Sequence, residues 1–145
     1  MLRILGLDVG DVRIGVALSD PLGLTAQPHA VITRDRKGSE FSALQRIIDE
    51  FEVKRIVLGL PLNMNGTLGQ QAQRVKVFAE LLRRMAPHVE IEFWDERLSS
   101  AASERILINS GMRRNKRRRT IDKVAAAIIL QGYLDRQRAQ SAEPE

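Results

Sequence analysis

Three acidic positions in this 145-residue sequence lie where carboxylates could act together on a substrate. Asp8 ends a run of apolar residues, Asp95 and Glu96 follow another such run, and Asp122 comes just after a cluster of basic residues. A carboxylate among apolar neighbours costs folding free energy unless it is paired or binds a metal. Clustered carboxylates raise one another's pKa unless a divalent cation neutralises them. These positions therefore predict a shared site for Mg²⁺ or Mn²⁺, which favour oxygen ligands.

Such a site suits the cleavage of phosphodiester bonds. Two divalent ions about 3.5–4 Å apart can bind both the attacking and the leaving oxygen of an in-line displacement. Two of these positions have an ordinary structural interpretation, because Asp122 can stabilise a helix dipole and Asp95-Glu96-Arg97 can form a surface ion pair. Asp8 is less easily explained in this way. The occurrence of all three at the ends of elements favours a shared site.

Positive charge is concentrated in one segment of the chain. The formal net charge is +5, from 23 basic and 18 acidic residues. Six basic residues lie within one short stretch and outweigh that excess, so the rest of the chain is close to neutral: Arg113, Arg114, Lys116, Arg117, Arg118 and Arg119. We expect this basic segment to be a loop that holds nucleic acid beside Asp122. The alternative is a solvated loop without a partner.

Composition excludes several classes of protein. Cysteine is absent and His29 and His88 are the only histidines, which excludes disulfides, zinc-finger sites and multi-histidine metal sites. The longest apolar run, Val124 to Leu130, is far shorter than the roughly 20 residues of a membrane span. Because Asp8 interrupts the N-terminal apolar stretch, we expect no secretory signal, no membrane partner and a cytoplasmic location.

The spacing of apolar residues predicts an α/β fold. Strands are expected at residues 2–8, 13–19, 24–33, 55–60 and 90–94. Helices are expected at 39–51, 70–85, 98–111 and 120–136, with Ser39 and Thr120 as caps. Three strands followed by alternating strands and helices indicate a mixed sheet with helices on both faces, in one domain over residues 1–136. Residues 137–145 lack apolar anchors and are expected to form a disordered tail.

Four segments, in this order, resemble the YqgF/RuvX family. They are Gly6-Leu7-Asp8-Val9-Gly10 with Arg13-Ile14-Gly15-Val16-Ala17, then Val57-Leu58-Gly59-Leu60-Pro61 with Asn63 and Gly66, then Asp95-Glu96-Arg97-Leu98-Ser99, and finally Asp122-Lys123-Val124-Ala125-Ala126. The match is collinear to about Leu134. That family is similar to the Holliday-junction resolvase RuvC, so the resemblance implies a ribonuclease H-like fold with strand order 3-2-1-4-5 and the second strand antiparallel.

The resemblance also implies roles for individual residues. Asp8, Glu96 and Asp122 would be the catalytic carboxylates that bind two Mg²⁺ or Mn²⁺ ions. Asp95 is the substitute for Glu96, because successive residues of a strand face opposite sides. The expected nucleic-acid contacts are Arg13, Asn63, Arg97, Lys123 and the basic segment, which is Arg113, Arg114, Lys116, Arg117, Arg118 and Arg119.

Two positions depart from the pattern. Asp11 stands where the family often has a less acidic residue. Ala125 stands one turn after Asp122, where RuvC-type resolvases carry a fourth carboxylate. The second departure argues against transfer of the full junction-resolvase mechanism.

Family members are described as Holliday-junction resolvases and as nucleases that mature the 5′ end of 16S ribosomal RNA. The favoured hypothesis is a metal-dependent endonuclease that acts on precursor ribosomal RNA, as a monomer or a homodimer. The alternatives are a junction resolvase, which needs two active sites, and a non-catalytic nucleic-acid-binding module. An ATP-dependent phosphotransferase is disfavoured, because that related fold needs two such domains.

Overall fold

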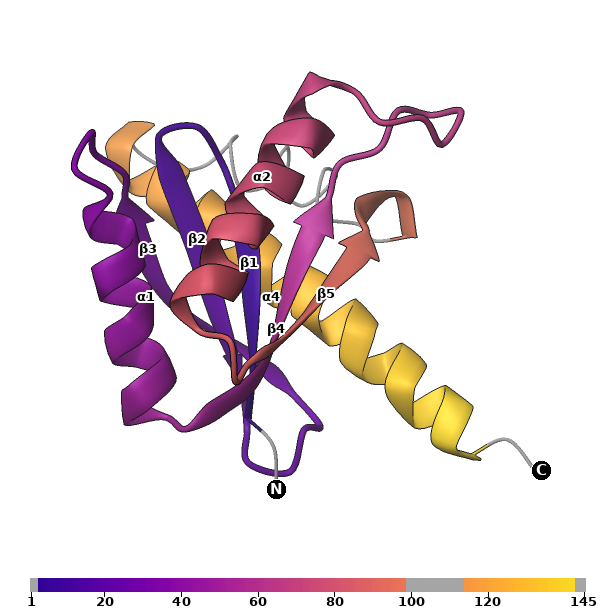
Figure 1. The fold of residues 1–145 in the computed structure, drawn as a ribbon. Coiled ribbons are helices and arrows are strands. Elements are labelled where there is room, and N and C mark those ends of the chain that lie inside the picture. Colours follow the sequence, from indigo (N-terminus) through magenta and orange to yellow (C-terminus); the bar gives the residue numbers. More distant parts are fainter. Residues whose placement is uncertain (1–2, 99–113, 143–145) are drawn as a thin grey trace.

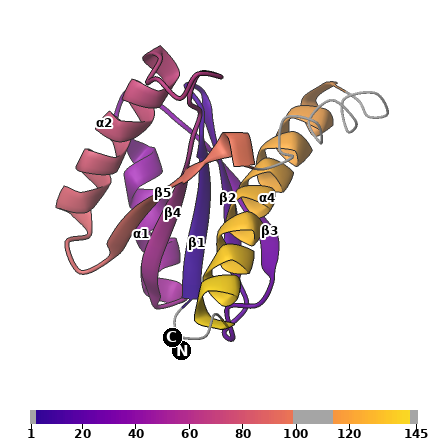
Figure 2. The same cartoon turned by 90° about the vertical axis from the view of Figure 1, so that its right-hand side faces the viewer.

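The computed structural model describes residues 3–98 and 114–142 and shows a five-stranded mixed sheet between layers of helices (Figure 1, Figure 2). The strand order is β3-β2-β1-β4-β5, which confirms the order implied by the resemblance. Strand β1 pairs antiparallel with β2 and parallel with β4, while β3 is antiparallel to β2 and β5 parallel to β4. The strands are β1 (Arg3–Val9), β2 (Arg13–Ser19), β3 (Ala26–Thr33), β4 (Val53–Leu60) and β5 (Glu90–Asp95). Pro28 lies in the edge strand β3, as expected.

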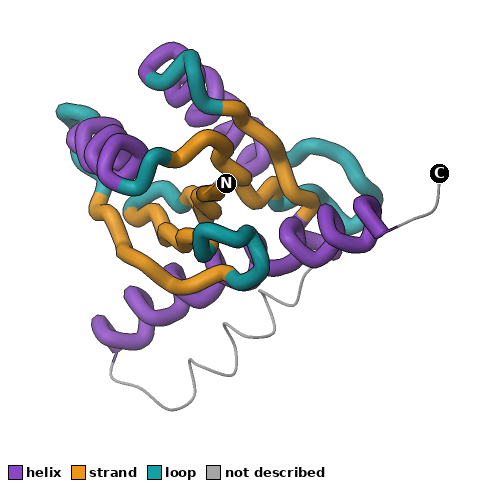
Figure 3. Tube along the Cα trace, turned by 90° about the horizontal axis from the view of Figure 1, so that it is seen from below, coloured by secondary structure: helices purple, strands orange, loops and turns teal. Residues whose placement is uncertain are grey.

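Helices α1 (Ser39–Glu50) and α2 (Gln70–Met85) cover one face of the sheet, and α4 (Arg114–Ala142) covers the other (Figure 2, Figure 3). A single 3₁₀ turn, η1 (Glu96–Leu98), follows β5. Successive residues of a strand face opposite sides of the sheet, so the apolar side chains form two separate hydrophobic cores. Leu5 and Leu7 join the core under α1 and α2, whereas Ile4 and Val57 join the core under α4. Both faces of the central strands are therefore buried, as is usual for parallel strands.

Helix α4 lies unusually close to the sheet because glycines face it. A Cβ built on Gly6 of β1 would lie 2.7 Å from Cβ of Leu130, closer than two side-chain carbons can approach. The helix backbone therefore packs almost directly on β1. Within the described residues, no helix is both long and apolar enough to cross a membrane.

Helix boundaries are where the sequence-based expectations were wrong. The cap of α1 is Gly38, at a φ of 75°, and not Ser39, because the Asp35 carboxylate already accepts the Lys37 and Ser39 N–H groups. Helix α4 begins at Arg114, so Thr120 is an internal helical residue.

The basic segment is therefore helical from Arg114 onward, where a loop was expected. Arginine and lysine are good helix formers, which explains the early start. The helix also runs to Ala142, so residues 137–142 are helical where a disordered tail was expected. Apart from Leu98 in η1, the helix expected at 98–111 lies almost wholly outside the described residues, as do residues 143–145.

Candidate active site

Strands β1, β4 and β5 have their carboxyl ends at the same end of the sheet (Figure 1). The three acidic positions lie at this end. Asp8 is the penultimate residue of β1, and Glu96 directly follows β5. Asp122 lies on α4, in its third turn and not in the first turn as expected from the sequence. Ligands of open α/β sheets bind at this end of the strands.

Asp8 lies on the face of the sheet that α4 covers. Along β1, Ile4 belongs to the core beneath α4 and Gly6 faces Leu130 of that helix. Alternate residues of a strand share a face, so Asp8 continues this row. Its side chain is partly buried.

Two glycines flank Asp8 on the neighbouring strands. Gly15 of β2 is its partner in the antiparallel register. Gly59 of β4 follows Leu58, which pairs with Leu7, so it lies beside Asp8 on the other side. Neighbouring strands are about 4.8 Å apart, so anything that lies over either glycine is close to Asp8.

The space over each glycine is taken by another acidic residue. A Cβ on Gly15 would lie 2.0 Å from the backbone oxygen of Asp122. A Cβ on Gly59 would lie 3.1 Å from Cγ and from Cδ of Glu96. The structure thus places the backbone of Asp122 and the side chain of Glu96 over the two glycines that flank Asp8. Both glycines lie inside motifs that carry the family resemblance, Arg13–Ala17 and Val57–Pro61, and this was the sequence signal that could have identified them.

The same contact distinguishes Glu96, the preferred ligand in the sequence analysis, from its substitute Asp95. The Glu96 side chain lies over Gly59, on the face that also carries Asp8. Asp95 instead accepts hydrogen bonds from Arg97, at 2.7 to 3.1 Å. These bonds from the Arg97 side chain lower the pKa of Asp95 below its usual value.

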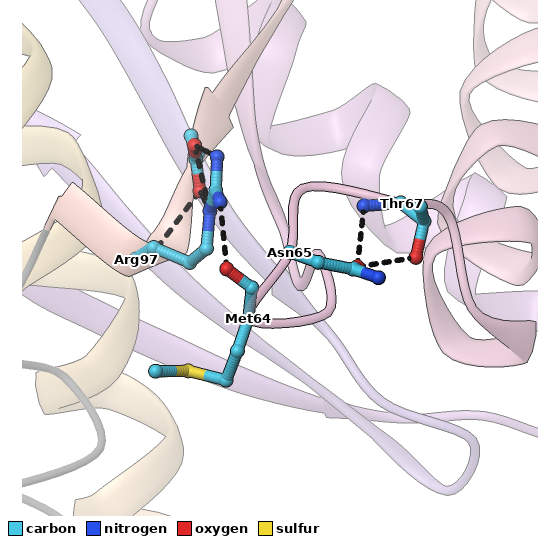
Figure 4. A network of polar contacts seen from close by, with 5 residues as sticks. Met64, Asn65, Thr67 and Arg97 are labelled. Atoms are coloured by element: carbon cyan, nitrogen blue, oxygen red, sulfur yellow. Dashed lines mark hydrogen bonds and ion pairs between the residues drawn. The ribbon is translucent and has the colours of Figure 1, made fainter.

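Arg97 also anchors the loop at residues 61–69. Its Nη1 donates to the carbonyl of Met64, 3.2 Å away (Figure 4). Within the loop, the Asn65 carboxamide accepts two hydrogen bonds from Thr67, and the Asn63 side chain donates to the Thr67 hydroxyl. Arg97 and Asn63 were expected to contact nucleic acid, and in the structure both side chains form hydrogen bonds with this loop. The Asn65-Gly66 pair, with Gly66 at a φ of 85°, was the sequence signal for this turn.

Arg13, another expected nucleic-acid contact, is paired with Asp122. Its Nε donates to Oδ2 of Asp122 at 2.8 Å, and the two side chains are 28% and 21% exposed. Lys123, the next residue of α4, is partly exposed. Arg113 lies outside the described residues, as do the side chains of Arg114, Lys116, Arg117, Arg118 and Arg119.

The donor set suits Mg²⁺ or Mn²⁺ chemically, because all three side chains offer carboxylate oxygens on one face. However, over residues 3–98 and 114–142 no three His, Asp or Glu side chains lie close enough together to hold a metal ion. The Asp122 carboxylate is instead paired with Arg13.

Comparisons with known proteins identify relatives of this chain. Residues 2–136 match the family model described as "RuvX: Holliday junction resolvase". A relative from Desulforamulus reducens, named "Putative pre-16S rRNA nuclease", is 53% identical over 134 residues, covering 92% of this chain and 97% of the relative. A relative of the same name from Syntrophomonas wolfei is 50% identical over 134 residues, covering 92% and 94%.

Solved structures show a shared fold at low sequence identity. RuvC from T. thermophilus, in complex with a Holliday junction substrate, aligns with a TM-score of 0.61 at 12% identity, covering 95% of this chain and 96% of RuvC. The fowlpox virus Holliday junction resolvase aligns with a TM-score of 0.51 at 12% identity, covering 93% and 99%. The chain therefore has the RuvC-like, ribonuclease H-like fold.

Proposed function

Because this chain belongs to the RuvX family, we propose that it is a metal-dependent endonuclease that processes the precursor of 16S ribosomal RNA. The observation that carries the proposal is the gathering of Asp8, Glu96 and Asp122 on one face, around Gly15 and Gly59. The names of relatives at about half identity support RNA as the substrate.

In this proposal, Asp8 and Glu96 hold Mg²⁺ or Mn²⁺, and Asp122 supplies a third carboxylate. When bound, such an ion supplies a Lewis acid for the scissile phosphate and lowers the pKa of water. Asp8 is suited to this role because β1 is hydrogen-bonded on both sides, which fixes its backbone. Glu96 is fixed at its base by the end of β5 and lies over Gly59.

The basic segment and Lys123 would hold the phosphate backbone beside Asp122. Lysine and arginine that neutralise phosphates release counterions, so this binding should weaken with added salt. Arg13, Asn63 and Arg97 already have partners within the chain, and the proposal gives them no direct contact with RNA.

The test is a cleavage assay with precursor 16S ribosomal RNA in Mg²⁺ or Mn²⁺, with EDTA as the metal-free arm. We expect Asp8→Asn to retain its fold and to lose more activity than the roughly 10–100-fold that loss of a second-shell partner costs. Asp49→Asn, an exposed position of α1 on the other side of the sheet, is the matched control and should cleave normally. Full cleavage by Asp8→Asn, or cleavage in EDTA, would contradict the proposal.

A second candidate is resolution of four-way DNA junctions, which the description of the family model favours. A synthetic four-way junction therefore runs beside the RNA in the same assay. Cleavage of the junction alone would replace RNA with branched DNA as the substrate. Salt-sensitive binding of both, without cleavage of either in any divalent metal, would identify a binding module.

A further inference from the structure

The structure pairs the third carboxylate of the proposed site with an arginine. Arg13 is the first residue of β2, and its guanidinium contacts the Asp122 carboxylate across 109 positions of sequence. Arg13 and Gly15 lie two residues apart on the same face of β2, and Gly15 is the partner of Asp8. The pair therefore lies beside Asp8 and not at a remote surface.

The close approach of α4 to β2 makes this contact possible. Because Gly15 has no side chain, the backbone of Asp122 lies directly on it, and this brings the Asp122 carboxylate within reach of Arg13. The exposed fractions of 28% and 21% show that both side chains are partly shielded from solvent. Shielding strengthens the effect of one charge on another, compared with a pair in bulk water.

We propose that Arg13 is a positioning residue that competes with the divalent cation for the carboxylate of Asp122. The inference rests on the proposed function, because it takes Asp122 as part of the cation site. In the metal-free protein, Arg13 neutralises the Asp122 carboxylate and holds it away from Asp8 and Glu96. Binding of the cation then requires Asp122 to exchange the guanidinium for the metal.

A purely structural ion pair would behave differently, and the chain offers such a pair for comparison. Arg55 contacts Glu90 at 2.7 Å, and the Arg55 side chain is 22% exposed. This pair lies near the amino ends of β4 and β5, at the other end of the sheet from the proposed site. Removal of either arginine removes one ion pair of similar geometry. Of these two arginines, Arg13 is the one that contacts a carboxylate of the proposed site, so its removal and not that of Arg55 should alter the affinity for metal.

The experiment measures binding of Mn²⁺ to the full-length protein by isothermal titration calorimetry. The variants are Arg13→Gln, Arg13→Lys, Arg55→Gln and Asp122→Asn. We expect Arg13→Gln to bind Mn²⁺ roughly three- to tenfold more tightly than the original protein, because a cation no longer opposes the metal. Arg13→Lys keeps the charge and should bind within about twofold of the original protein. Arg55→Gln should leave binding unchanged, and Asp122→Asn should weaken it.

A thermal-shift measurement keeps the test decisive if Arg13→Gln is less stable than the original protein. Tighter binding to the folded state gives a larger rise in Tm at a given Mn²⁺ concentration. Unchanged or weaker Mn²⁺ binding by Arg13→Gln, with no larger rise in Tm, would overturn the inference. The proposed function would survive that result as long as Asp8→Asn remained inactive. Cleavage by Asp8→Asn would remove the proposed function itself, whatever the result with Arg13.

Discussion

Asp122 contacts β2 through two different groups, its backbone oxygen and its carboxylate. Its backbone oxygen lies over Gly15, where no side chain could fit, and its carboxylate meets Arg13. The first contact sets the distance between α4 and the sheet, and the second sets the direction of the carboxylate. Both depend on residues of one short motif, Arg13-Ile14-Gly15.

The backbone contact predicts a specific effect of Gly15→Ala. The added methyl group would lie 2.0 Å from the backbone oxygen of Asp122, so it must push α4 away from β2. Overpacking of this kind typically costs about 1–3 kcal/mol of stability. We expect a lower free energy of unfolding in urea and a loss of cleavage, because Asp122 moves with the helix.

Gly23→Ala is the control for this substitution. Gly23 has a φ of 70° and open space around it, so alanine there adds backbone strain without a clash. It should lower stability and leave cleavage unchanged. Equal loss of cleavage in both variants would show that the position of α4 is not what matters.

At the scale of elements, the loop at residues 61–69 is held in place by the end of β5. Arg97 links the Asp95 carboxylate to the Met64 carbonyl, and Asn65 accepts hydrogen bonds from Thr67 within the loop (Figure 4). The Asn63 side chain also donates to the Thr67 hydroxyl. The loop therefore has a defined shape beside Glu96. Met64 is 92% exposed on it.

Arg97→Gln should release this loop without unfolding the protein. We expect several-fold faster hydrogen exchange at the Asn63 and Gly66 amides, which donate to Thr67 and Asn63 carbonyls. The Tm should change little, because an exposed ion pair contributes little to stability.

The control is Arg83→Gln, which removes an exposed ion pair with Glu80 on α2 and should leave loop exchange unchanged. Loss of cleavage by Arg97→Gln with loop exchange unaltered would mean that Arg97 contacts the substrate directly.

The elements themselves were largely predictable from the sequence, because apolar periodicity reports which faces are buried. The stripe of α2 and the alternation in β5 are clear examples, with Val75, Phe78 and Leu82 buried on one side of the helix. The start of α4 was not predictable in this way, because a run of arginines has no apolar period although it favours a helix. The pairing of Arg13 with Asp122 depends on how closely α4 approaches Gly15. This distance between two elements cannot be read from the local sequence pattern of either one.

At the scale of the whole molecule, the face covered by α4 carries polar clusters at both ends. One is the carboxylate site beside Gly15 and Gly59. The other, near the amino ends of β4 and β5, joins Arg55, Glu90, Glu92 and Tyr133. Arg55 donates to the Tyr133 hydroxyl at 3.0 Å, and that hydroxyl donates to Glu92. The second cluster links α4 to the sheet.

This second cluster predicts a pH dependence of stability. Burial, together with the hydrogen bond to Glu92, raises the pKa of Tyr133 to about 12. The folded state therefore favours the neutral hydroxyl, and its contribution is complete below pH 10 and is lost as the pH rises from about 10 to 12. We expect the free energy of unfolding to fall by roughly 1–3 kcal/mol over that interval.

Tyr133→Phe provides the reference for this measurement, because it lacks the titrating group. The difference between the two proteins in urea unfolding at pH 9, 10, 11 and 12 isolates the contribution of Tyr133. Identical pH dependence of the two proteins would show that the hydroxyl titrates equally in the folded and unfolded states.

The most direct test of the site compares Glu96→Gln with Asp95→Asn in the cleavage assay with precursor ribosomal RNA. Of these adjacent residues the sequence analysis favoured Glu96 and kept Asp95 as its substitute, and the structure places Glu96 over Gly59 and Asp95 against Arg97. We predict that Glu96→Gln abolishes cleavage and that Asp95→Asn retains most of it. Loss of cleavage in Asp95→Asn with full activity in Glu96→Gln would contradict this account of the site.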